Sequence, residues 1–245
     1  MRRTLPGGPG DVLVGASLKY ADLTRLADEV IDLDRAGIDF FLFDICDGCF
    51  VEELVFGPLF IDCLRPHSNK PFVARLMLRN PLSIVEPVVK AGADIVVFHL
   101  ESDDDPLETA GTIAAAGAVP GLALYPETRC TIPSPLWNEL QLLFLPTIHR
   151  HSAAGSPKMD AITRRMGELA REAEAGKALV RLAVNGDLDE TAVRAFSRVG
   201  ADTFIAGSTG LFGRSVDYAM AIESLRVAAL KARKNGAMEE MEHGF

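Results

Sequence analysis

Acidic and basic residues stand at the ends of several apolar runs of this chain, where they could take part in proton transfer. Asp44 ends the run 38–44, and Asp47-Gly48 follows shortly after it. A carboxylate at the junction of a buried strand and a loop is well placed to move a proton or to bind a ligand. The run 71–77 holds Arg75, which we expect to contact a carboxylate because an unpaired buried charge is strongly unfavourable.

Further candidates lie at the ends of the other apolar runs. On the run 12–18, Ser17 and Lys19 fall on one face, as Arg75 and Met77 do on the run 71–77, because side chains alternate along a strand. The remaining run ends offer polar side chains or backbone donors: His99, Glu101, Asn185, Gly186, Asp187, Gly207 and Ser208. If the runs are parallel strands of one sheet, these groups meet at its carboxyl edge.

The order of the apolar runs predicts a barrel. A helix-to-strand junction recurs as RAGIDFFLFD, KAGADIVVFH and RVGADTFIAG, in which a glycine ends a helix and a continuous apolar run follows. Strands are expected at 12–18, 38–44, 71–77, 94–100, 119–125, 141–147, 179–184 and 202–207. Helices are expected at 22–36, 58–65, 81–91, 106–116, 134–138, 157–175, 188–199 and 215–234. This alternation predicts an α/β protein with a single (β/α)8 TIM barrel.

The barrel is expected to span residues 12–230, between a flexible leader over 1–11 and a polar tail over 231–245 that frays. The net charge of −9 argues against binding to nucleic acid or to an acidic membrane. No apolar run approaches the ~20 residues of a membrane helix. The N-terminus lacks the apolar core of a secretory signal, so the cysteines are expected to be reduced thiols in the cytoplasm.

Several motifs together resemble the ribulose-phosphate 3-epimerase family. FDICDGCFVEELVFGPL is similar to that family's D-x-x-D-G-x-F-V followed by F-G-P-L, and SLKYADLTRL to its S-x-L-S-A-D opening. FVARLMLRNP, FHLES, GLALYPET and IAGSTGLFG match further family motifs in the same order. The resemblance covers about residues 12–228. It implies a barrel of the ribulose-phosphate-binding type, a phosphorylated sugar as substrate, an isomerase or epimerase reaction, and a homo-oligomer.

The resemblance also implies a metal site, from which this sequence departs. Family members hold a zinc-like or iron-like ion with His and Asp on strand two, His on strand three and Asp on strand seven. The matching residues here are Leu42, Asp44, Arg75 and Asn185, of which only the aspartate is a strong ligand. We therefore predict that the family metal is absent and that there is no other cofactor. Lys19 and Arg75 would then stabilise the enediolate, with Asp44 as the base.

An amide cannot exchange protons, so a two-base epimerisation would need a donor in place of Asn185. Asp187, His99, Glu101 and His149 are the candidates for that role. Five further residues fall at positions of the family's motifs that would contact the substrate or its phosphate: Ser17, Met77, Gly186, Gly207 and Ser208. The loop 148–158 is longer and more basic than the family's, and its His149 could bind a phosphate or a larger acidic group. Asp187 stands where the family has a glycine, and its carboxylate would repel a phosphate.

Other interpretations remain open from the sequence. Asp44 and Arg75 could form a static ion pair in a catalytically silent sugar-phosphate-binding protein. Lys19 and Arg75 could instead serve a decarboxylase or an aldolase, the latter through a Schiff base on the lysine. Cys46 and Cys49 have the spacing of redox and zinc sites, but no second pair of cysteines accompanies them.

Overall fold

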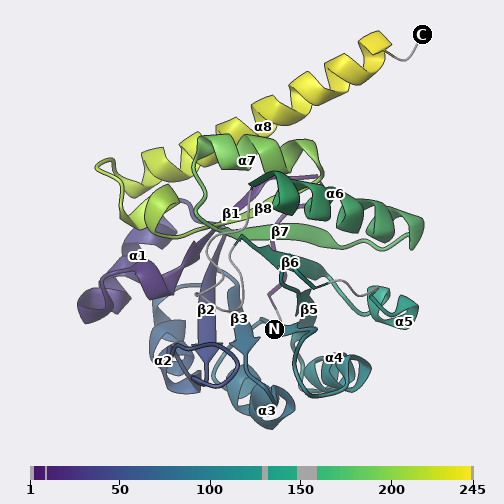
Figure 1. Cartoon of the computed structure of the whole chain (residues 1–245). Helices are drawn as coiled ribbons and strands as arrows, with labels where there is room; N and C mark the ends of the chain where they lie inside the picture. The colour runs from purple at the N-terminus through teal and green to yellow at the C-terminus, as the bar shows by residue number, and fades with distance from the viewer. Residues whose placement is uncertain (1–2, 9, 129–131, 148–158, 244–245) are drawn as a thin grey trace.

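Parallel strands form a closed barrel in this protein. The computed structural model describes residues 3–8, 10–128, 132–147 and 159–243, with side chains to residue 234. The strands follow the order β1-β2-β3-β4-β5-β6-β7-β8 around the barrel, and the helices surround them (Figure 1). The predicted (β/α)8 barrel is therefore confirmed.

The bounds of the elements agree with the expected alternation to within about four residues, except for the end of α8. The strands are β1 Leu13–Ser17, β2 Phe40–Cys46, β3 Phe72–Met77, β4 Ile95–His99, β5 Val119–Ala123, β6 Leu142–Pro146, β7 Arg181–Gly186 and β8 Thr203–Ala206. The helices are α1 Leu26–Arg35, α2 Pro58–Leu64, α3 Leu82–Lys90, α4 Pro106–Ala115, α5 Ser134–Trp137, α6 Met159–Ala175, α7 Glu190–Arg198 and α8 Tyr218–His243.

The core has two main parts, and their packing decides which residues reach the carboxyl end of the barrel, which is its mouth. The larger part packs the outer faces of the strands against the helices. The barrel interior is filled by alternate strand residues, among them Phe40 and Leu42 on β2, Val73 on β3, and Val97 on β4. Side chains alternate strictly along a strand, so the same inward rows continue at the carboxyl ends. Those next inward positions are Ser17, Asp44, Arg75, His99 and Asn185.

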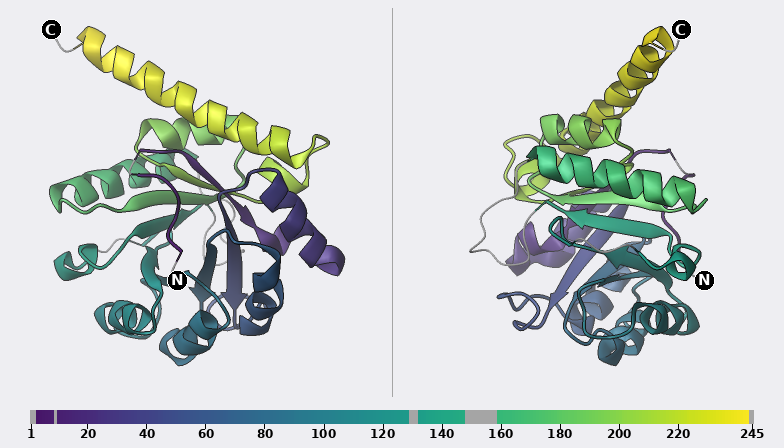
Figure 2. Two further views of the ribbon diagram at one scale, coloured as in Figure 1. Left: turned by 180° about the vertical axis from the view of Figure 1, so that it is seen from behind. Right: turned by 45° about the vertical axis from the view of Figure 1, so that its right-hand side comes forward.

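Two element boundaries differ from the sequence-based expectation. β1 ends at Ser17, so Lys19 lies in the following 3₁₀ turn, Leu18–Tyr20, and not on the strand. α8 continues to His243, beyond its expected end at 234, so most of the expected polar tail is helical. This helix projects past the body of the barrel (Figure 2). No helix in the described ranges is long and apolar enough to cross a membrane.

Residues 3–8 cross the end of the barrel where the strands begin, and hydrogen bonds hold them there (Figure 2). The backbone N–H of Arg3 donates to Asp94, just before β4, at 3.1 Å. The guanidinium of Arg181, the first residue of β7, donates to the carbonyl oxygens of Pro6 at 3.0 Å and Gly8 at 2.7 Å. Residues 3–8, part of the segment expected to be a flexible leader, therefore lie against the end of the barrel opposite to the mouth.

Candidate active site

A buried ion pair lies at the mouth of the barrel between the second and third strands. The register of these strands places Asp44 beside Arg75. Nε of Arg75 donates to Oδ1 of Asp44 at 2.8 Å, and the two side chains are only 3% and 1% exposed. The hydroxyl of Ser17, on β1, donates to the other carboxylate oxygen at 3.4 Å. The carboxylate thus lies between a hydroxyl and a guanidinium.

The guanidinium of Arg75 is only partly satisfied by this pair. Its carbon lies 4.6 Å from the ring centroid of Phe144, on β6, so the group packs over an aromatic face. Nη1 is buried and has no hydrogen-bond partner among the described residues. Burial alone would lower the pKa of Arg75, but the adjacent carboxylate of Asp44 raises it above its ordinary value, so the group stays charged. A charged, buried donor without a partner is suited to an anionic acceptor on a ligand.

Lys19 approaches the same mouth, and its side chain is paired with an acidic residue of a loop. Its ammonium contacts the carboxylate of Glu53 at 2.7 Å, and Glu53 belongs to the loop between β2 and α2. Burial lowers the pKa of Lys19, but the hydrogen bond that it donates to Glu53 and the charge of Asp44 raise the pKa above its ordinary value. Lys19 therefore stays protonated, which does not suit a Schiff-base nucleophile, because that role requires a neutral amine.

The fourth strand contributes a histidine to the mouth. Nδ1 of His99 lies 3.3 Å from Oε2 of Glu101, and the ring stacks on Tyr125 with centroids 4.9 Å apart. Glu101 also accepts from the backbone N–H of Tyr125 at 2.8 Å and from the hydroxyl of Thr128. Burial lowers the pKa of His99 despite the opposing effect of Glu101, so the ring is neutral at pH 7. Nε2 of His99 is buried and has no hydrogen-bond partner among the described residues.

An apolar cluster closes the mouth over these polar groups. It consists of Cys46, Phe50, Val51, Met77 and Tyr125. Phe50 and Val51 belong to the loop that follows β2, and both side chains are buried in this cluster. Burial raises the pKa of the Cys46 thiol to about 12, and Cys49 is exposed, so the C-x-x-C spacing does not form a paired site. Met77, expected to contact substrate, lies in this cover with its sulfur 3.7 Å from that of Cys46.

The ends of β7 and β8 form the other side of the mouth. The amide of Asn185 donates to the carbonyl oxygen of Ile205 at 3.4 Å, which holds it against β8. Gly186 has φ +142°, and a Cβ there would lie 1.8 Å from Oγ1 of Thr147, so only glycine fits. Oδ1 of Asp187 accepts from the hydroxyl of Thr209 at 3.1 Å.

The turn after β8 was expected to bind a phosphate. Gly207 is buried, and a Cβ at this position would lie 2.9 Å from the ring of Tyr20. Ser208 is exposed and begins the short turn Ser208–Phe212. The carboxylate of Asp187 is held beside this turn by Thr209, which places a negative charge near the expected phosphate position.

The four residues at the family's metal-ligand positions do not fit a divalent ion. Leu42 lies in the apolar interior of the barrel, and the amide of Asn185 is directed to β8. Asp44 is the one carboxylate of the set, and the cationic guanidinium of Arg75 occupies one side of it at 2.8 Å. A cation would be repelled from that position. No other group of His, Cys, Asp or Glu suited to a metal occurs in the described part of the chain.

The structure brings together most of the residues that were expected at the site. Asp44, Arg75 and Ser17 are in contact, and Lys19 reaches the same mouth through Glu53. Glu53 was missed by the sequence analysis. The signal for it was the pair of acids at 52–53 between the apolar residues of 50–51 and 54–56, whereas its pairing with Lys19, 34 residues away, has no sequence signal. His149 lies outside the described residues.

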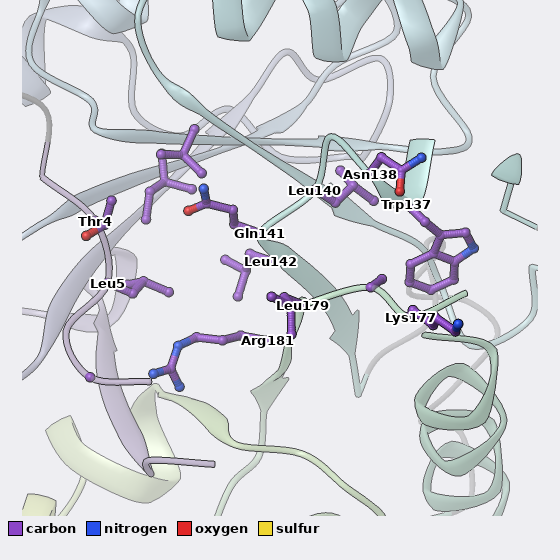
Figure 3. A pocket seen from close by; sticks show the side chains of 14 residues that line it. Thr4, Leu5, Trp137, Asn138, Leu140, Gln141, Leu142, Lys177, Leu179 and Arg181 are labelled. Carbon is purple, nitrogen blue, oxygen red and sulfur yellow. The ribbon is translucent and has the colours of Figure 1, made fainter. Parts of the chain in front are cut away.

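A cavity among the described residues lies away from this site. It has a volume of about 560 Å³ and is lined by Thr4 and Leu5 of the N-terminal segment, and by Trp137 and Lys177 (Figure 3). Its walls also include the first residues of four strands: Ile95, Val119, Leu142 and Arg181. The cavity is therefore at the amino end of the barrel, where side chains of this fold serve stability and not catalysis.

Known proteins resemble this chain over most of its length. The sequence profile of the Ribulose-phosphate 3 epimerase family matches residues 13–212. The chain is 29% identical to the ribulose-phosphate 3-epimerase of Bacillus subtilis over 216 residues, which covers 88% of this chain and 98% of that protein. It is 29% identical to ribulose-phosphate 3-epimerase 1 of Cupriavidus necator over 228 residues, covering 91% and 95%.

Solved structures confirm the fold. KGPDC from Streptococcus mutans superimposes with a TM-score of 0.63 at 14% identity, covering 91% of this chain and 99% of that one. Orotidine 5'-phosphate decarboxylase from Pyrococcus horikoshii gives a TM-score of 0.59 at 14% identity, covering 89% and 99%. At these identities the likeness establishes a common barrel and nothing about the reaction.

Proposed function

This chain belongs to the ribulose-phosphate 3-epimerase family, and from that premise we propose that it is a divergent member acting without the family metal ion. Its substrate is a phosphorylated ketose, and the reaction is an epimerisation or isomerisation through an enediolate. The observation that carries this proposal is Nη1 of Arg75, a buried charged donor beside the Asp44 carboxylate that has no partner in the described part of the chain. It offers to a developing oxyanion the electrostatic stabilisation that a metal ion supplies elsewhere.

Each polar group of the mouth has a role in this proposal. Asp44 removes the proton from the carbon beside the carbonyl group, and Ser17 and Arg75 position its carboxylate. Arg75 binds the oxygen on which negative charge develops. Lys19 adds positive charge to the mouth, and its contact with Glu53 ties this charge to the loop that covers the site. Asn185 lies on the far side and takes no proton.

The phosphate end of the proposed site uses the turn after β8. Gly186, Gly207 and Ser208 would bind the anion through backbone N–H groups and a hydroxyl. Asp187 favours substrates whose phosphate lies away from its carboxylate. This arrangement supports a change of substrate preference within the family.

The test is proton exchange in D₂O. Purified protein is incubated with ribulose 5-phosphate, and deuterium incorporation beside the carbonyl is followed by NMR. We expect incorporation by the wild type after chelation of metals, and a loss of about 100-fold or more in Asp44→Asn. Asp62→Asn, an exposed carboxylate on α2, is the matched control and should exchange normally.

The closed ion pair also suits the alternative of a silent sugar-phosphate-binding protein. A ligand that binds only the folded state raises the melting temperature whether or not it reacts. A shift in melting temperature with ribulose 5-phosphate, without deuterium incorporation, would favour the silent protein. A stoichiometric metal ion that survives purification, and whose removal abolishes exchange, would contradict the metal-free mechanism.

A further inference from the structure

An epimerisation needs a second proton-transfer group, and Asn185 cannot be that group. One residue must take the proton from one face of the substrate carbon, and another must return a proton to the opposite face. The amide of Asn185 has no proton to exchange, and its hydrogen bond to Ile205 holds it against β8. The structure therefore has to supply the second group from elsewhere in the mouth.

His99 occupies a suitable place, on the other side of Arg75 from Asp44. Arg75 is on β3, between β2, which carries Asp44, and β4, which carries His99. All three are on the inward rows of their strands and almost fully buried. An oxyanion bound at the free Nη1 of Arg75 would thus have a carboxylate on one side and an imidazole on the other.

The contacts of the His99 ring decide which nitrogen is available. Burial raises the pKa of Glu101, but its hydrogen bonds with His99, Thr128 and the backbone N–H of Tyr125 bring the pKa below its ordinary value. The carboxylate is therefore ionised and can only accept from Nδ1 of His99. Nδ1 must therefore carry the proton in the neutral ring, which leaves the lone pair on Nε2. Phe50 and Tyr125 pack against the ring, at centroid distances of 5.2 and 4.9 Å, and fix its plane. This is the arrangement of a histidine base oriented by a carboxylate.

We propose that His99 is the second proton-transfer residue of this site, acting through Nε2, and that Glu101 is its positioning residue. The inference rests on the proposed enediolate chemistry. In one direction, Asp44 takes the proton as the C–H bond breaks, and the electron pair becomes the enediolate held by Arg75. Imidazolium His99 then gives its Nε2 proton to the opposite face of that carbon. Asp44 ends protonated and His99 neutral, and proton exchange with solvent restores the starting state; the reverse reaction exchanges their roles.

The surroundings of His99 set the pH dependence of this step. The groups that act on the ring are Glu101 from its own strand end, Arg75 from β3, and Asp44 from β2, while Tyr125 after β5 stacks on it. Burial is the largest effect and lowers the pKa of His99 below its ordinary value of about 6.5. Asp44 and His99 must together hold one transferable proton. The alkaline limb of the pH profile of kcat/KM should therefore lie below about pH 6.5.

The experiment separates deuterium exchange from epimerisation. With ribulose 5-phosphate in D₂O, His99→Gln should keep exchange at the face served by Asp44 and lose epimer formation by about 100-fold or more. The exposed His67, changed in the same way, is the control and should retain both. Glu101→Gln should slow epimerisation and move the alkaline limb of kcat/KM, which a merely structural role would not do.

Each outcome bears on one of the two proposals. No exchange by the wild type would contradict the enediolate chemistry itself. Wild-type exchange together with undiminished epimerisation in His99→Gln would overturn only the role of His99, and so would the loss of both activities in a folded variant. A measurement on the wild type without substrate tests the proposed tautomer of His99 without relying on either activity. ¹⁵N NMR of the imidazole should find the neutral ring protonated at Nδ1, and protonation at Nε2 would overturn the proposal.

Discussion

The ion pair between Asp44 and Arg75 should be strongly coupled in folding, and a double-mutant cycle can measure this coupling. In Arg75→Met, the carboxylate of Asp44 stays buried with only the 3.4 Å contact from Ser17. In Asp44→Asn, the guanidinium stays buried and loses its one carboxylate. Breaking a buried pair by removing one partner typically costs about 3–5 kcal/mol, and we expect each single variant to fall in this range.

The double variant should behave differently because it leaves no buried charge. Among the described residues, Arg75 contacts Asp44 and the ring of Phe144, and its Nη1 has no hydrogen-bond partner there. Replacing a buried pair by neutral side chains of similar volume is often neutral or stabilising. We expect Asp44→Asn with Arg75→Met to lie within about 1 kcal/mol of the wild type, so that the coupling energy is of the order of 5 kcal/mol or more.

Urea denaturation gives the required free energies of unfolding. The four proteins of the cycle are compared at fixed pH, and the m-value shows whether the unfolding transition stays comparable. Additive losses, with a coupling energy below about 0.5 kcal/mol, would refute the reasoning, because they would mean that the charges do not depend on each other. All three variants should also lack exchange activity, so the double variant would be stable and inactive. Such a result would assign the pair to function, not to stability.

Two further predictions concern backbone geometry and thiol reactivity at the mouth. In urea denaturation, Gly186→Ala should lower the free energy of unfolding by roughly 2 kcal/mol or more, because the added Cβ would clash with Thr147 at a φ of +142°. The control is Gly111→Ala, in open space on α4, which should be neutral or stabilising in the same assay. Because the pKa of the Cys46 thiol is raised to about 12, iodoacetamide at pH 8 should label Cys49 more than about 100-fold faster, as read by peptide mass spectrometry. Equal labelling of the two thiols in the folded protein would contradict the buried position of Cys46.

The barrel could be predicted from the sequence because its signals are local and repeated. Continuous apolar runs alternate with amphipathic segments, and glycine recurs at the helix ends, as at Gly37, Gly92 and Gly200, each with positive φ. The expected contact of Arg75 with a carboxylate followed from the cost of an unpaired buried charge, and the structure places it on Asp44. These conclusions needed only strand position and charge.

The arrangement at the rim of the mouth could not be predicted in the same way. Lys19 was expected on a strand face, but β1 ends earlier, and the side chain meets Glu53 from a loop 34 residues away in sequence. The pairing of His99 with Glu101 depends on the turn after β4, whose geometry no periodicity specifies. Loop conformation depends on contacts made after the barrel closes, so alternation patterns carry no information about it.

The residues at the family's ligand positions together keep the buried charge of the site balanced. A divalent ion can neutralise two carboxylates, but a guanidinium neutralises one. With Arg75 in place of the ion, Asp44 is balanced, and a second acid at position 185 would leave a buried carboxylate without a counter-charge. The amide at Asn185 and the aliphatic Leu42 avoid that imbalance, because neither brings a charge into the barrel. The same substitution removes the second acid, so a reaction that inverts a carbon centre has to take its second proton from outside the ligand set. Glu101 can balance an imidazolium at His99, which makes this residue a donor that the site can hold without a metal ion.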